Sequence, residues 1–333
     1  NFSSVKIILK SKNNINYFEF TKQIILNSAF SSLKDQFDDL YQSILKELHY
    51  DEINQRFFFS NPDDINNVEN RLFRLLLQDE KSIRKVYRYT SLGTIFSSLK
   101  HNTYRINCLV GMNDTSEVNY VENIVLGTNR DYANANWKRV DSFNKRFISS
   151  CSLKKDDLTQ WRLYADDSKG VCMELKVNEE ALNGNIILKR ISYARKGGRH
   201  PELDLLKTIR ISLFNEHDII FDYKALSTWR HFFKPYDYAV EKEVRLLYVQ
   251  NDETIERGWV LTNSHQILNP YIEINLNEPA FPLKLERIVL GPKCPEMGIN
   301  KKQFQAYIRE LRGEPNYNLS DVTVANSSIK NYR

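Results

Sequence analysis

The chain has 333 residues, of which 41% are hydrophobic and 27% charged, and its net charge is +5. This composition is ordinary for a globular protein with a large core, and it excludes an intrinsically disordered chain. No run of about 18 apolar residues occurs, which excludes a membrane-spanning helix, and no signal peptide is visible. The length predicts two domains or one large one.

The cysteine pattern indicates the redox state of the thiols and the cellular compartment. The cysteines stand at positions 108, 151, 172 and 294, without a CxxC pair. This pattern predicts reduced thiols in a cytoplasmic protein, with neither a disulfide framework nor a zinc site. One basic cluster, "ARKGGRHP" at 194–201, could meet a phosphate, but a solvated loop is the simpler interpretation.

Residues 1–82 are predicted to form a helical N-terminal region. Apolar side chains recur at helical spacing in 31–48 and again in 60–77, where Ser60 or Asn61 would cap the helix before Pro62. No chemical motif falls in this region. We expect it to gate or position the rest of the protein and to offer an interface to a partner.

Residues 83–333 are predicted to form an α+β body. Strands are expected at 85–91, 103–108, 146–153, 170–177, 184–193, 243–249, 258–263, 270–276, 285–291 and 320–327. Helices are expected at 91–101, within 156–170, over most of 202–234 and near 300–312. Strict alternation of strand and helix is missing, which favours a mixed sheet with inserted helices over a doubly wound one.

The sequence motifs of several enzyme classes are absent. There is no GxxxxGK[ST], no GxGxxG after a strand, no HExxH and no GxSxG, and the six histidines are scattered. These absences argue against P-loop, Rossmann, zincin and serine-hydrolase functions.

The stretch "VEKEVRLLYV" at 240–249 carries two glutamates, Glu241 and Glu243, at the start of an apolar strand. Residues two apart on a strand point to the same face, so both carboxylates are expected in one cleft, where repulsion would raise one pKa. The alternative is a solvated strand end with Lys242 and Arg245 nearby.

Two further strands extend this pattern. "VYRYTS" places Arg88 beside Tyr89, and "FISSCS" places Ser150 and Ser152 on one side of a strand. The order arginine, serine, paired glutamate resembles the Arg-Ser-Glu pattern of ADP-ribosyltransferases, although Cys151 stands where threonine is common. The resemblance implies a split-sheet body that uses NAD as substrate and needs no metal.

The roles that this resemblance implies can be assigned residue by residue. Arg88 would hold a phosphate or ribose of NAD, and Ser150, with Ser149 or Ser152, would brace the nicotinamide ribose. Glu243 would stabilise the charge that develops as nicotinamide leaves, and Glu241 would orient the acceptor. Tyr89, Trp161 and Tyr164 are added as cofactor-binding candidates, although Trp161 and Tyr164, three apart on a helix, equally suit a core.

A broader resemblance covers about residues 84–330. The blocks "VYRYTSLGTIFSSL", "MNDTSE", "QWRLYADDSKGVCMEL", "AVEKEVRLLY" and "LERIVLGP" resemble the bacterial family catalogued as domain of unknown function 2971. That family supplies no activity. The expected function is ADP-ribose transfer to a protein or nucleic acid, or NAD hydrolysis, in a toxin or phage-defence effector without membrane attachment.

Two alternatives remain open at this stage. Asp167, Glu174 and Lys176 have the order of a metal-dependent nuclease, Asp followed by ExK across a hairpin. A non-enzymatic sensor of a ligand or nucleic acid would also suit the mild positive charge and the abundant aromatic residues.

Overall fold

The structure is a computed structural model that describes residues 38–51, 53–54, 56–61, 64, 66–77, 82–108, 115–126, 145–183, 185–250, 255–261, 268–314 and 317–330. The chain divides into two compact units. Unit 1 combines Asn1–Gln78 with Asp114–Asp131 and Ser192–Tyr236, and unit 2 combines Asp79–Asn113, Tyr132–Ile191 and Asp237–Arg333. The first division lies close to the expected boundary at 82, but two later segments join unit 1.

Unit 1 contains helices and two small sheets. The antiparallel pair β1 and β2 continues into β9, which lies parallel to β2, and β8 pairs with β10. The elements are α4 (Asp38–Glu47), β1 (Leu48–Asp51), β2 (Arg56–Phe59), α5 (Val68–Leu76), α7 (Thr115–Val125), β8 (Ser192–Tyr193), α10 (Pro201–His217), β9 (Ile220–Asp222), α11 (Leu226–Trp229), the 3-10 helix Arg230–Phe232 and β10 (Phe233–Lys234).

The expectation of an all-helical N-terminal region is not confirmed. Strands β1 and β2 separate the two helices, and α5 begins at Val68 with Asn67 as its cap, whose side chain accepts from the amide of Asn70. Ser60 and Asn61 therefore do not cap this helix. Residues 31–37 and Pro62 lie outside the described residues.

Aromatic packing builds the core of unit 1. Phe73 stacks on Trp229 with ring centroids 6.1 Å apart, and the Trp229 indole donates to the Asn70 side chain at 2.6 Å. Phe59 meets Phe221 edge-on at 5.8 Å. These contacts join residues about 160 positions apart in the chain, so the unit depends on long-range packing.

Unit 2 is built on one large mixed sheet, as expected. Its strands are β3 (Lys85–Thr90), β4 (Thr103–Cys108), β5 (Arg146–Ser152), β6 (Val171–Val177), β7 (Ile186–Arg190), β11 (Glu243–Val249), β12 (Arg257–Leu261), β13 (Leu268–Asn275), β14 (Leu283–Leu290) and β15 (Thr323–Asn326). All the strands expected from residue 85 onward are present, with shifted ends.

The sheet forks at β5. Along one edge, β5 pairs with β11 over its whole length. On the other edge it pairs with β4 at Phe147 and Ile148 but with β3 at Ser152. One branch therefore continues through β4, β13 and β12, and the other through β3, β6, β14 and β15.

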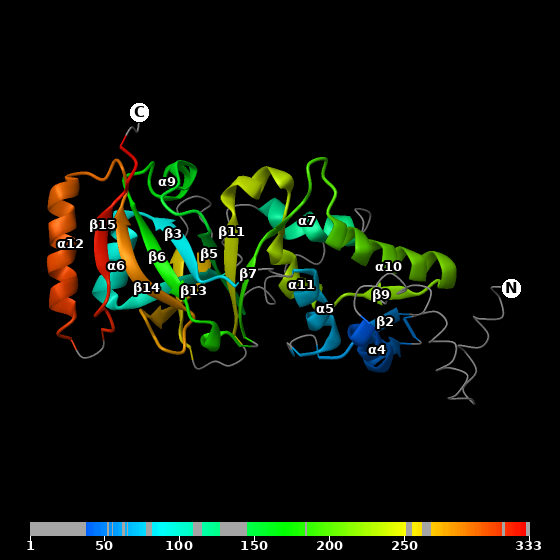
Figure 1. The fold of residues 1–333 in the computed structure, drawn as a ribbon. Coiled ribbons are helices and arrows are strands. Elements are labelled where there is room, and N and C mark those ends of the chain that lie inside the picture. The colour runs from blue at the N-terminus through cyan, green and yellow to red at the C-terminus, as the bar shows by residue number, and fades with distance from the viewer. Residues whose placement is uncertain are drawn as a thin grey trace. The chain divides into compact units, whose positions relative to one another are not determined.

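The main core of unit 2 lies against the inward faces of both branches. It includes Val86 from β3, Tyr104 from β4 and Phe147 from β5, together with side chains of α6 (Leu92–His101) and α12 (Met297–Leu311). Figure 1 shows α12 running beside β15 at the outer edge of the sheet. The opposite face of the second branch carries α9 (Leu158–Tyr164) over a smaller cluster around Trp161.

A tight turn connects α9 to β6. Asp166, Asp167 and Ser168 are consecutive left-handed residues, with φ of 50°, 45° and 72°. Gly170 closes the turn where a Cβ atom would stand 2.1 Å from the Thr90 carbonyl oxygen. Only glycine allows the two backbones this approach. The turn thereby fixes where the end of α9 meets the sheet.

Candidate functional site

Glu241 and Glu243 lie in different elements. Strand β11 begins at Glu243, whereas Glu241 ends the 3-10 helix Tyr236–Glu241. Lys242 between them has a left-handed backbone with φ 48°, a conformation that costs free energy for a residue with a side chain. Because Glu241 is not on the strand, strand alternation does not apply to it, and the expectation of paired carboxylates in one cleft stays a prediction.

Glu243 forms a buried ion pair with Arg245. The Arg245 Nε donates to Glu243 Oε1 at 2.7 Å and its second nitrogen donates to Oε2 at 3.3 Å. Their side chains are 6% and 2% exposed. Because both carboxylate oxygens accept from a guanidinium, this fork-to-fork contact neutralises Glu243 and fixes its orientation.

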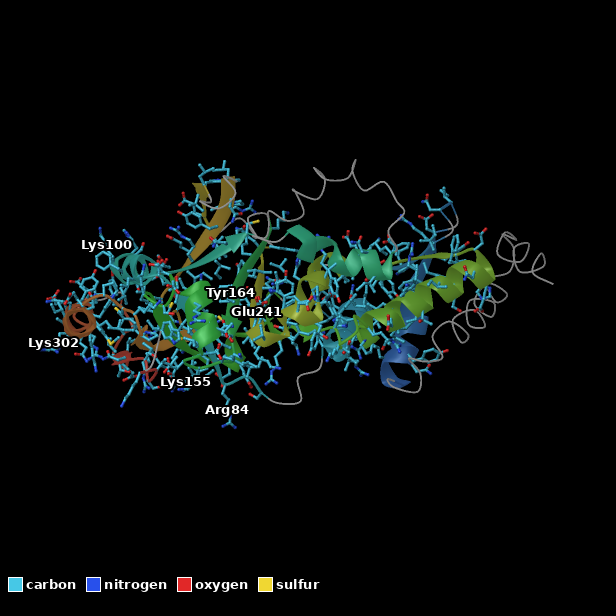
Figure 2. The ribbon with its side chains drawn as sticks, turned by 90° about the horizontal axis from the view of Figure 1, so that it is seen from above. Arg84, Lys100, Lys155, Tyr164, Glu241 and Lys302 are labelled. Atoms are coloured by element: carbon cyan, nitrogen blue, oxygen red, sulfur yellow. The ribbon has the colours of Figure 1, made fainter. Side chains whose placement is uncertain are left out.

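Glu241 lies in a different environment. The Tyr164 hydroxyl donates to Glu241 Oε1 at 2.5 Å, and Tyr164 is 46% exposed. The Glu241 carbonyl oxygen accepts from Ser152 Oγ at 2.6 Å and from Gln160 Nε2 at 3.3 Å. We call Glu241, Tyr164, Ser152 and Gln160 the Glu241 site; Figure 2 shows Tyr164 and Glu241 side by side. The arrangement presents a hydrogen-bonded carboxylate beside an exposed aromatic ring.

Helix α9 positions Tyr164 and Gln160. Asp157 caps the helix by accepting from the Gln160 amide at 3.1 Å. Trp161 is fully buried, meets Tyr89 edge-on at 4.9 Å and donates from its indole nitrogen to Asp156 at 2.8 Å. Tyr164 is the last residue of the helix and is 46% exposed.

Trp161 and Tyr89 have structural roles in this environment. Tyr89 is buried, donates its hydroxyl to the Lys154 carbonyl at 2.8 Å and accepts from the Asp157 amide at 3.0 Å. Burial raises the pKa of Tyr89. Both rings are buried, whereas Tyr164 is 46% exposed. We therefore assign the contact with a cofactor to Tyr164 alone, and cofactor binding by the three aromatic residues stays a prediction.

Arg88 lies on the other face of the sheet from the glutamates. It donates to Ser149 Oγ at 3.0 Å and to the Arg105 carbonyl at 3.3 Å, with its guanidinium over the Tyr104 ring at 4.7 Å. Ser149 and Glu243 are on opposite faces because Glu243 pairs in register with Ser152, which alternates with Ser149 along β5. The fork places β3 and β11 beside β5, but it does not bring the Arg88 side chain to Glu243.

The two serines of the expected motif are separated in role. Ser152 is buried and belongs to the Glu241 site through its hydrogen bond to the Glu241 carbonyl. Ser150 is exposed and lies opposite Arg245 in the ladder between β5 and β11. Both stand on the Glu241 side of the sheet, as their spacing predicts.

The residues of the nuclease alternative do not form a metal site. Glu174 lies among three cations: Lys85 Nζ at 3.0 Å, Lys155 Nζ at 3.5 Å and Arg287 at 3.9 Å. Asp167 pairs instead with Lys293 at 3.1 Å. A divalent cation at Glu174 would be repelled by the three positive charges. Within the described part of the chain, no group of three or more His, Cys, Asp or Glu side chains could hold a metal ion.

All four cysteines are buried and free. No helix among the described residues is long and apolar enough to cross a membrane. The cytoplasmic location stays a prediction.

Sequence reasoning missed Gln160 and did not foresee the partners of Arg88. The pattern Asp157-x-x-Gln160 is a helix-start signal, but it gives no indication that the Gln160 side chain reaches the Glu241 carbonyl. Tyr104, which shares Ser149 with Arg88 through a 2.7 Å hydrogen bond, lies in a strand without a motif.

Comparison with known proteins adds one finding. Residues 160–246 match the model of a family described as "Protein of unknown function (DUF2971)". The match begins at Gln160 in α9 and ends in β11, so it contains Tyr164, Glu241, Glu243 and Arg245, and it supports part of the broader resemblance expected for 84–330. Searches of the curated proteins and of the solved structures gave no match.

Proposed function

We propose that this protein is an NAD-using enzyme of the ADP-ribosyltransferase type, with Glu241 in place of Glu243 as the carboxylate that meets the substrate. The contact between Glu241 and the exposed Tyr164 is the observation that carries the proposal. Glu243 is already neutralised by Arg245, so it supports the site without facing the substrate. The serine strand and the glutamate strand lie side by side, which agrees with the Arg-Ser-Glu order of such enzymes.

The chemistry assigned to Glu241 is electrostatic. Cleavage of the bond between nicotinamide and ribose leaves positive charge on the ribose carbon, and a carboxylate that accepts from a ribose hydroxyl stabilises that charge. Nicotinamide leaves with the bonding electrons. An acceptor hydroxyl or water then bonds to the same carbon and passes its proton to Glu241 or to solvent. The half-exposed Tyr164 ring offers a surface on which nicotinamide can stack.

The position of Arg88 changes one assigned role. Because Arg88 lies on the opposite face and donates to Ser149 and the Arg105 carbonyl, it is not assigned to the diphosphate in this proposal. Lys154 and Lys155 stand two and three residues after Ser152, and the Lys155 side chain is half-exposed. They are the cations that we assign to the diphosphate of NAD.

The test is release of nicotinamide from NAD by the full chain, measured by chromatography with water, RNA and protein extract as acceptors. Glu241→Gln and Tyr164→Phe should each lower the rate, and the first by about 10²-fold, the usual effect of losing one charge-stabilising group. Glu310→Gln, an exposed glutamate on α12, is the matched control and should leave the rate unchanged. Wild-type protein that releases no nicotinamide with any of these acceptors would overturn the proposal.

A further inference from the structure

Three lysines stand in one row across the second branch of the sheet. Lys85 on β3 lies opposite Lys176 on β6, and Lys176 lies opposite Lys284 on β14. Directly paired residues in a ladder point to the same face, with neighbouring strands about 4.8 Å apart. The three side chains, which we call the lysine row, therefore line up over about 10 Å.

Such a row has an electrostatic cost. Like charges in directly opposite positions of a sheet are destabilising. Lys85 offsets part of this cost through Glu174 at 3.0 Å and Glu286 at 2.6 Å. Within the described part of the chain, Lys176 and Lys284 have no carboxylate at salt-bridge distance. Lysines at strand ends are often only solvated. Here the three lysines stand in register, and the charges of two of them are not neutralised by a carboxylate of the described residues, so they form an ordered positive surface.

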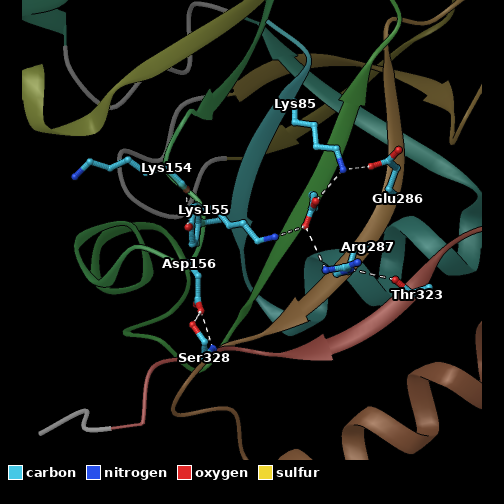
Figure 3. Close-up of polar contacts among 10 residues, drawn as sticks. Lys85, Lys154, Lys155, Asp156, Glu286, Arg287, Thr323 and Ser328 are labelled. Carbon is cyan, nitrogen blue, oxygen red and sulfur yellow. Dashed lines mark hydrogen bonds and ion pairs between the residues drawn. The ribbon is translucent and has the colours of Figure 1, made fainter.

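A second row reinforces the first. Tyr87, Glu174 and Arg287 are the paired residues next to the lysine row. Glu174 is almost fully buried, and Lys85, Lys155 and Arg287 converge on it while keeping side-chain exposures of 43%, 53% and 43% (Figure 3). The cations around it lower the pKa of Glu174, against the effect of its burial. The carboxylate thus holds three cations at the surface.

A β-bulge adds to this arrangement. The register between β14 and β6 shifts between Leu285 and Arg287, so Glu286 is an extra residue in β14. The bulge lets both Glu286 and Arg287 reach the outer face, where Glu286 meets Lys85 and Arg287 meets Glu174. The face therefore carries five cations against two carboxylates: Lys85, Lys155, Lys176, Lys284 and Arg287 against Glu174 and Glu286.

We infer that this outer face of β3, β6 and β14 binds single-stranded nucleic acid through its phosphate backbone. A strand that crosses the sheet would meet one lysine on each of three β-strands, with Arg287 and Lys155 behind them. The half-buried Tyr87 lies in the adjacent row. Its aromatic ring is of the kind that stacks with bases in proteins that bind single strands. The cations stand on a sheet face, which suits an open strand better than the groove of a duplex.

The inference does not rest on NAD chemistry. Lys155 is assigned to both sites, and the variants below leave it unchanged. The full chain is titrated into a fluorescein-labelled single-stranded RNA of about 20 nucleotides, long enough for one site, and anisotropy is recorded over a series of salt concentrations. The variant Lys176→Gln with Lys284→Gln removes two charges that form no ion pair with any described residue, so folding should be preserved. We expect about tenfold weaker binding and a salt slope smaller by about 1.4, from two lost phosphate contacts.

The matched control is Lys100→Gln with Lys302→Gln, which removes the same charge from exposed positions on α6 and α12 (Figure 2). It should change the affinity less than about twofold. Equal losses in both variants would show that only net charge matters and would overturn the inference. Wild-type protein that prefers duplex, or that binds only anionic lipid vesicles or polyglutamate, would overturn it as well.

Discussion

Glu243 and Arg245 stand two residues apart on the same face of β11, and Arg245 Nε donates to Glu243 Oε1 at 2.7 Å. Glu241 precedes the left-handed Lys242 and accepts a hydrogen bond from the Tyr164 hydroxyl. The acidic start of this apolar strand therefore consists of two buried carboxylates, one ion-paired with Arg245 and one hydrogen-bonded to the exposed Tyr164.

The first prediction concerns the stability of this ion pair. Glu243→Gln leaves a buried guanidinium without its countercharge, which typically costs about 3 kcal/mol or more of unfolding free energy. We therefore expect a lower urea midpoint for this variant, the reverse of the relief that repulsion between Glu241 and Glu243 would predict. Glu241→Gln keeps a hydrogen-bonding partner for Tyr164 and should change the midpoint little.

The double variant Glu243→Met with Arg245→Met is the control for this interpretation. It removes both charges together and replaces them with apolar side chains, an exchange that is often neutral or stabilising. Its midpoint should lie above that of Glu243→Gln. A double variant that is less stable than the single one would show that Arg245 is held mainly by other contacts.

The second prediction uses two glycines of unit 2. Gly170→Ala places a Cβ atom 2.1 Å from the Thr90 carbonyl oxygen and 3.0 Å from the Ala165 carbonyl oxygen, both backbone atoms. Relief requires a shift of the turn after α9, and we expect a loss of about 2 kcal/mol in urea unfolding. Because the same turn positions α9, nicotinamide release should fall with it. Gly298→Ala meets nothing within 4 Å in the first turn of α12 and should be neutral or stabilising.

How far the sequence predicts the fold depends on the kind of signal. Strands such as "RFISSCSL" and "EVRLLYV" are readable because their apolar residues face a core on at least one side. The strand Arg56–Phe59 falls within the region expected to be helical, because its aromatic run shows no alternation of apolar and polar residues. Its partner β9 lies about 160 residues further along. Local pattern cannot report a pairing of that separation.

The candidate site was predicted in its strands but not in its side-chain directions. The fork decides that Arg88 meets Ser149, because β3 and β4 share one edge of β5. A lysine at position 242 does not predict a left-handed backbone, because glycine, asparagine and aspartate are the residues that usually adopt that conformation. A single left-handed residue was enough to separate Glu241 from Glu243.

The third prediction separates the structural role of Arg88 from a role in NAD binding. Arg88→Lys loses the fork of donors that reaches Ser149 Oγ and the Arg105 carbonyl together. We expect about 1–2 kcal/mol lower stability in urea unfolding. The KM for NAD should stay close to the wild-type value, because Arg88 lies on the face away from Glu241. A large rise in KM with unchanged stability would restore Arg88 to the substrate site.

The last prediction concerns Glu69 in unit 1. Its carboxylate is fully buried, and one oxygen accepts from the Ala225 amide at 2.9 Å. Burial, with a smaller contribution from the Asp222 charge, raises the pKa of Glu69 to about 8, against the opposing effects of the Ala225 hydrogen bond and Lys224. The folded protein therefore holds a proton that the unfolded chain releases near pH 4.5.

The sign of the pH dependence follows from this difference. Between pH 4.5 and about 8 the folded state binds more protons than the unfolded state at this position, so stability falls as the pH rises. The full effect is on the order of 4 kcal/mol, present below the lower value and lost above the higher one. Glu69→Gln imitates the protonated side chain and should flatten the decline of the melting temperature across this range, whereas Glu310→Gln should keep it. An equal decline in Glu69→Gln would assign the pH dependence to other groups, because the amide that replaces the carboxyl does not titrate.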